Sequence, residues 1–128
     1  NILRNSMKAT IVKFIKGFAY AFAGMAAAVR SERNMKFHLF VTACVIAAGI
    51  GFRISVGEWI ACALCIGMVF GAEMLNTAIE KLADAVSAER NDNIRFVKDV
   101  AAGAVLVCAI AAAVVGLIIF VPKIIALF

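Results

Sequence analysis

The N-terminal part of the chain carries the periodicity of a helix with one apolar face. Between Met7 and Val29, large apolar residues recur at steps of four and three, namely Ile11, Ile15, Phe18, Phe22 and Met25. The other faces carry the polar residues Lys8, Lys13, Lys16 and Tyr20. This pattern predicts an amphipathic helix over 7–29. Lysines among aromatic residues favour a helix in the headgroup plane of a bilayer, and a helix packed against its own protein is the alternative.

Three longer apolar stretches follow, and each is predicted to cross a bilayer. The first helix is expected at about 35–52, after the polar run RSERNMK, and its apolar part is only marginally long enough to span. A tight turn over RISVGE leads to a second helix over 57–86, whose polar end should project from the bilayer. After a loop over 87–93, the third helix is predicted over 98–121 and should end at Pro122.

The composition also indicates a membrane protein. Of the 128 residues, 65% are hydrophobic and 16% are charged, and the mean hydropathy is +1.02. A water-soluble chain of this length could not bury so much apolar surface. Because no segment shows the alternation of a strand, the expected fold is an all-α membrane protein with a single domain over 1–128. The four cysteines all lie in apolar runs and are interpreted as packing residues.

The distribution of basic residues predicts an orientation. Of the 13 Lys and Arg, seven precede the first predicted span and four lie between Lys81 and Lys98. The positive-inside rule therefore places the N-terminus and the second loop in the cytoplasm, and the protein in the cytoplasmic membrane. The net charge of +5 fits anionic lipid and nucleotide partners and requires no nucleic acid. Because no cleavable signal sequence is visible, insertion is expected to rely on the apolar helices themselves.

One face of the second span carries the candidate chemistry. Glu73, Asn76, Glu80 and Asp84 follow one another at steps of three, four and four, so all four lie within about 80° on a helix. An ionisable group at membrane depth costs about 2.5–3.5 kcal/mol and is functional by default. Because neighbouring carboxylates repel one another, this stripe suggests a divalent metal or a basic partner.

Further charged residues are expected to converge on the cytoplasmic end of this stripe. Glu32 precedes the first span, and Lys98 and Asp99 precede the third. Carboxylates and lysines without a histidine cluster suit Mg²⁺ and phosphate. The chain contains no GxxxxGK[ST] or GxGxxG loop, so side chains and metal would have to hold a nucleotide.

Each of these residues also has a structural interpretation. Glu73 and Glu80 could bridge to Lys98 or to lysines of the surface helix, and Glu32 could be a solvated interfacial charge. Lys98 and Asp99 could anchor and cap the third span. His38, at the mouth of the first span, is interpreted as an interfacial or packing residue.

The stretch EMLNTAIEKLADAVSAERNDNIRFVKDVAAGA, over 73–104, resembles the signature of the small integral-membrane diacylglycerol kinases of bacteria, with its ExLNTAIE core and its downstream KDxAAGA. The likeness extends over essentially the whole chain. The stretches KGFAYAFAG and SERNMKFHL, over 16–24 and 31–39, are similar to the branch of this family that includes undecaprenol kinases.

The resemblance implies a homotrimer with active sites between subunits at the cytoplasmic interface. It implies direct transfer of the γ-phosphate of ATP to the hydroxyl of diacylglycerol, giving phosphatidic acid, with undecaprenol as the alternative acceptor. Glu73 matches the family's catalytic base, and Glu32 and Glu80 match the carboxylates that hold Mg²⁺ on the nucleotide. The nucleotide site would include Asn76, Asp84, Lys98, Asp99, Tyr20 and Lys13.

Two positions depart from the enterobacterial form of the family pattern. Asn91 stands where a histidine is found, and Lys13 stands where an arginine is found, which keeps the charge but not a bidentate fork. Two alternatives from other classes are a small oligomeric channel or transporter, with Glu73 and Glu80 lining an ion path, and an inactive scaffold. The polar stripe stops at Glu73 and the outer halves of the spans are apolar, which disfavours the channel.

Overall fold

The computed structural model describes residues 1–87, 89 and 91–128, and this part of the chain consists of four helices without a strand. They are α1 (Ile2–Ser31), α2 (Arg33–Phe52), α3 (Val56–Val86) and α4 (Asp92–Ile125). Each is long and apolar enough to cross a membrane by its length and composition. The prediction of an all-helical membrane protein is therefore confirmed. Because α1 meets the same criteria, length and composition do not distinguish a surface helix from a fourth span.

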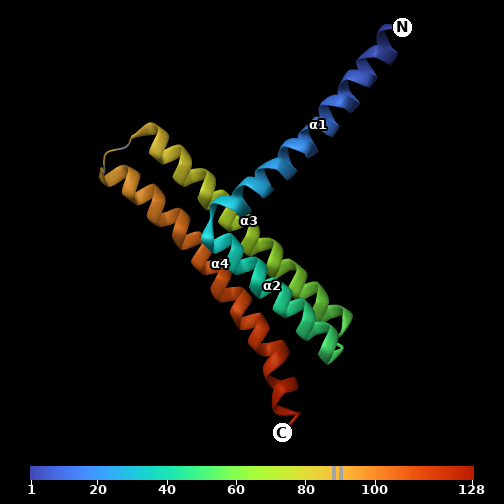
Figure 1. Ribbon diagram of the computed structural model, residues 1–128, viewed down its shortest axis with the longest axis vertical. Helices are drawn as coiled ribbons and strands as arrows, with labels where there is room; N and C mark the ends of the chain where they lie inside the picture. The colour runs from blue at the N-terminus through green and yellow to red at the C-terminus, as the bar shows by residue number, and fades with distance from the viewer. Residues whose placement is uncertain (88, 90) are drawn as a thin grey trace.

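α3 and α4 form a long antiparallel hairpin, with α2 packed along α3 (Figure 1). Ion pairs join the two ends of the hairpin: Lys98 binds Asp84 near the loop, and Lys123 Nζ lies 2.7 Å from Glu58 Oε2 at the opposite end. The best-packed core lies near this opposite end, where Ile54, Cys62 and Ile119 are buried together. All four cysteines are unpaired thiols.

The turn between α2 and α3 is fixed by local chemistry. Arg53 ends α2 in the left-handed conformation, with φ 53° and ψ 53°, and its backbone N–H returns to the carbonyls of Gly49 and Ile50. Ser55 then begins α3 with a capping box, because its hydroxyl accepts from the Glu58 N–H while the Glu58 side chain accepts from the Ser55 N–H. The chain therefore reverses within three residues.

α4 is longer at both ends than the span predicted over 98–121. It begins at Asp92 because the side chain of Asn91 caps it, accepting from the Ile94 N–H at 2.9 Å. The loop predicted over 87–93 is shorter, and two of its residues, Ala88 and Arg90, lie outside the described residues. The helix also continues through Pro122 to Ile125. Proline removes one helical hydrogen bond, and Lys123 Nζ donates to the Ile119 carbonyl in the same turn.

α1 extends away from the other three helices, and only its C-terminal end meets them (Figure 1). Residues 1–27 are exposed, and Ala28 is the first buried residue. Glu32 alone separates α1 from α2, in an extended conformation with φ −113° and ψ 124°. The apolar face of α1 thus finds no cover within its own chain, as expected for a helix that lies on lipid or on another subunit.

Gly49 is a position where packing opposes helix propensity. A Cβ there would lie 2.5 Å from Cη2 of Trp59, whose indole is half-buried against the core, whereas a Cβ at Gly51 would meet nothing within 4 Å. Overpacking costs about 1–3 kcal/mol, against a gain of about 1 kcal/mol for replacing a helical glycine. We expect Gly49→Ala to lower the thermal midpoint in detergent and Gly51→Ala to leave it unchanged or raise it. Equal midpoints for the two variants would contradict this packing.

Candidate functional site

Glu73 is the most deeply buried charged residue in the described part of the chain. Its exposed fraction is 2%, and it lies on the α3 face that meets α2. One turn further along α3, the hydroxyl of Thr77 donates to the backbone carbonyl of Glu73 at 3.0 Å. Nε2 of His38, from α2, lies 3.6 Å from Oε2 of Glu73, and both side chains are largely shielded from solvent. A buried carboxylate is costly unless it has such a partner.

The sequence did not lead us to expect His38 beside Glu73. The interpretation of His38 as a packing residue is partly met, because its ring makes edge contacts with Phe37 and Phe70. It also supplies the one basic nitrogen of the described residues within ion-pair distance of Glu73. The sequence did contain a feature that could have indicated this role of His38, because an ionisable residue in a membrane span is a functional candidate by default.

Asn76 and Glu80 form a second contact on the same helix face. Nδ2 of Asn76 lies 3.4 Å from Oε1 of Glu80. Asn76 is only 8% exposed, and its Oδ1 is buried without a hydrogen-bond partner among the residues that the structure describes. A buried amide oxygen without a partner is costly, so it marks a place where a donor from outside this chain would be favoured.

The two α4 residues of the predicted site behave differently. Lys98 donates to Oδ1 of Asp84 and so ties the start of α4 to the polar stripe of α3. Asp99 instead lies 3.7 Å from Nε of Arg95 on its own helix, and both of these side chains are largely exposed. Within one chain, Lys98 joins the site and Asp99 does not.

The register of α2 against α3 locates Glu32. The two helices are antiparallel, with Gly49 beside Trp59 and His38 beside Glu73. Glu32, six residues before His38, therefore lies further toward the end of α3 that carries Asn76 and Glu80. It is half-buried, and its side chain does not cap α2.

Lys13 and Tyr20 are not brought to this site within one chain. Both are exposed on the part of α1 that extends away from the other helices (Figure 1). They lie 19 and 12 residues before Glu32, which on a helix corresponds to about 28 and 18 Å. Within one chain, neither residue therefore joins the polar stripe of α3.

The oxygen ligands of this region fit a metal that arrives with a nucleotide. In the described part of the chain, no group of three or more His, Cys, Asp or Glu side chains could bind a metal ion alone. Mg²⁺ in phosphate-transfer sites is usually held by one or two carboxylates together with the phosphates of the substrate. Glu32 and Glu80 match that requirement in number and chemistry.

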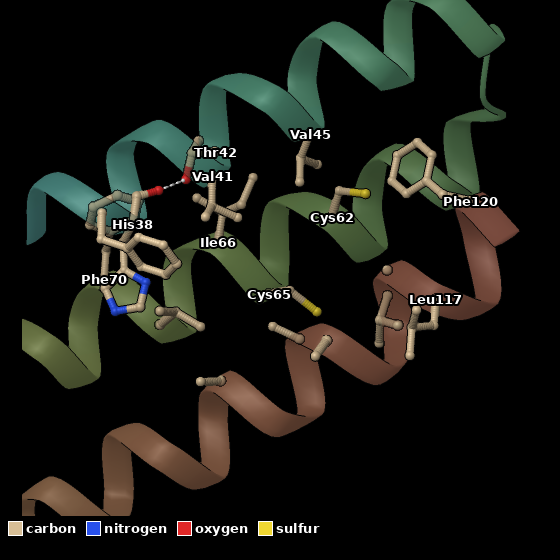
Figure 2. Close-up of a pocket in the computed structure, with 17 residues that line it drawn as sticks. His38, Val41, Thr42, Val45, Cys62, Cys65, Ile66, Phe70, Leu117 and Phe120 are labelled. Carbon is tan, nitrogen blue, oxygen red and sulfur yellow. Dashed lines mark hydrogen bonds between the residues drawn. The ribbon is translucent and has the colours of Figure 1, made fainter. Parts of the chain in front are cut away.

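An apolar cavity of about 510 Å³ begins beside the His38 and Glu73 pair. Residues of α2, α3 and α4 line it, with His38 and Phe70 at one end and Phe120 at the other (Figure 2). Small residues of α4, among them Ala109, Ala112 and Gly116, form one wall. The lining is suited to hydrocarbon, and its His38 end lies beside the buried carboxylate of Glu73.

Comparisons with known proteins agree with this chemistry. The family described as prokaryotic diacylglycerol kinase matches residues 19–120. The chain is 39% identical over 111 residues to the undecaprenol kinase of Bacillus subtilis, and the aligned region covers 87% of this chain and 90% of that protein. It is 33% identical over 126 residues to the diacylglycerol kinase of a Synechocystis species, and this aligned region covers 98% of this chain and 72% of that protein. The family match contains every predicted site residue except Lys13.

Proposed function

Because the chain belongs to the prokaryotic diacylglycerol kinase family and is therefore an ATP-dependent lipid kinase, we propose that Glu73 is its catalytic base. In this role the carboxylate takes the proton of the lipid hydroxyl while the hydroxyl oxygen attacks the γ-phosphorus of ATP. The transfer is direct, without a phosphorylated enzyme, because the base must be free to accept that proton. The observation that carries the proposal is the burial of Glu73 beside His38, which lines one end of an apolar cavity.

The nucleotide is proposed to bind on the loop side of Glu73. Glu32 and Glu80 would hold Mg²⁺, which supplies charge neutralisation at the phosphates. Asn76 has a buried oxygen without a hydrogen-bond partner among the described residues, and Lys98 offers a cation that Asp84 orients. We include Asp84 and the exposed Asp99 of α4 in the same nucleotide site. Asn91 is engaged as the cap of α4, so its side-chain oxygen is not free for adenine.

We further propose a homotrimer in the cytoplasmic membrane, with α1 on the cytoplasmic surface as an amphipathic helix and α2, α3 and α4 as the three spans. Lys13 and Tyr20 would then complete the nucleotide site of a neighbouring subunit. The uncovered apolar face of α1 and the exposed polar end of α3 support this arrangement. The mass of the detergent-solubilised protein, measured by light scattering, should correspond to three chains, and a monomer with full activity would exclude shared sites.

The proposed acceptor is diacylglycerol, with undecaprenol as the alternative. The family description and the Synechocystis relative support the first, and the Bacillus relative supports the second. Both lipids present one hydroxyl near the membrane surface. In a competition assay with both lipids in the same micelles, the natural acceptor should suppress phosphorylation of the other.

The cavity gives a test of acceptor binding that leaves the nucleotide untouched. Gly116 lines it, and an added Cβ there meets nothing within 4 Å, so Gly116→Leu should fill the space without clashing. We expect KM for the lipid to rise about tenfold, equivalent to about 1.4 kcal/mol, with KM for ATP unchanged. Gly67→Leu makes the same change at an open position of α3 that does not line the cavity. An equal effect of both variants would argue against lipid binding in the cavity.

A further inference from the structure

We propose that His38 is a positioning residue for catalysis, whose imidazole ring holds the Glu73 carboxylate in place between α2 and α3. This inference rests on the proposed role of Glu73. It adds a residue of α2 that acts through the base and contacts neither ATP nor metal in the proposed site.

The geometry joins the two residues across two helices. Nε2 of His38 and Oε2 of Glu73 are 3.6 Å apart, which is an ion-pair distance and slightly too long for a good hydrogen bond. The exposed fractions of the two side chains are 17% and 3%. At this low exposure, an electrostatic contact between the imidazole and the carboxylate is only weakly screened by solvent.

No other cation of the described chain is available to Glu73. Lys98 is engaged with Asp84, and Arg30 donates to the carbonyl of Ala26 on its own helix. Arg33 and Lys36, near the start of α2, are exposed. On α4, the ion pairs at both ends of the hairpin place about residue 108 level with Glu73, and the titratable group nearest to this level is the Cys108 thiol. The carboxylate of Glu80 lies two helical turns further along α3.

The aromatic neighbours of His38 hold its ring in this place. The ring centroid lies 5.8 Å from that of Phe37 and 6.2 Å from that of Phe70, with both contacts edge-on. The close-up shows His38 and Phe70 together at one end of the cavity (Figure 2). A lipid hydroxyl that reaches this end of the cavity would therefore lie beside the His38 ring, next to Glu73.

The proton balance shows why the position of the base matters. The new bond forms between the lipid oxygen and the γ-phosphorus, and the bond from that phosphorus to the bridging oxygen breaks as ADP leaves. Glu73 takes the hydroxyl proton and becomes a neutral carboxylic acid. After transfer it gives this proton to water, which restores the base, and a carboxylate held by His38 returns to the same place for the next cycle.

The test compares His38→Ala with the natural protein in mixed micelles. We expect kcat to fall about tenfold with KM for ATP and for lipid within twofold, and free imidazole to restore much of the loss by entering the space left by the ring. Lys36→Gln removes an exposed positive charge two residues away and should change none of these values. An unchanged kcat in His38→Ala would overturn the proposal.

A double-variant cycle separates positioning from simple packing. If His38 acts through Glu73, its loss should matter much less in a Glu73→Asp background, whose shorter carboxylate has already left the ion pair. The inference would be overturned if the losses of kcat in the two single variants simply added in the double variant, or if imidazole did not restore kcat in His38→Ala. Either result would assign His38 a packing role only. Activity retained by Glu73→Gln would instead refute the proposed base itself, so the two failures are distinguishable.

Discussion

Glu73→Gln is expected to lower kcat by about 10²- to 10⁴-fold, the usual contribution of a general base. The amide has nearly the shape of the carboxylate but cannot accept the hydroxyl proton. Because Glu73 is not itself one of the proposed nucleotide contacts, binding of ATP to the solubilised protein should change little. Steady-state kinetics of lipid phosphorylation, combined with a direct measurement of ATP binding, check both parts.

Glu89→Gln is the matched control for this variant. It makes the same chemical change at an exposed carboxylate beyond the end of α3, outside the proposed site. It should retain the natural kcat. If Glu73→Gln loses ATP binding together with activity, Glu73 is part of the nucleotide site and the base must be sought elsewhere.

Glu80→Gln is expected to shift the Mg²⁺ concentration needed for half-maximal activity upward by about 10- to 100-fold. Changes in the outer shell of a metal site already cost about this much in metal affinity, and loss of a direct carboxylate ligand should cost at least as much. The amide can still contact Asn76, so the helix face should keep its structure. A titration of activity with Mg²⁺ at fixed ATP measures the shift.

Two results would exclude the metal role of Glu80. The first is an unchanged Mg²⁺ requirement with a reduced kcat, which would make Glu80 a contributor to transfer or to structure. The second is loss of the folded protein, which a thermal melt of the variant would detect. Saturating Mg²⁺ should restore most of the activity if only metal affinity is affected.

The helices could be predicted because local chemistry determines them. The apolar periodicity over 7–29 and the uncharged stretch from Val100 to Val121 need no tertiary information. The polar stripe of α3 follows from helical spacing alone, and the motifs around it indicated the family that the comparisons then confirmed. The continuation of α4 through Pro122 was missed because proline was taken as the end of the helix, whereas the helix continues for three further residues.

The contacts between helices could not be predicted in the same way. The pairing of His38 with Glu73 joins residues 35 positions apart and depends on the register of α2 against α3, which the turn after Arg53 sets. The contact between Asp99 and Arg95 follows a simple step of four along one helix and could have been anticipated. The direction of α1 depends on a single extended residue, Glu32, and on whatever surface covers its apolar face.

The measurement that tests the account most directly is transfer of phosphate from radiolabelled ATP with Mg²⁺ in mixed micelles. Dioleoylglycerol and a short polyprenol serve as parallel acceptors, and Glu73→Gln is run beside the natural protein. The account predicts label on one of the two lipids with the natural protein and essentially none with the variant. Label from both proteins at the same rate, or on neither lipid, would contradict it.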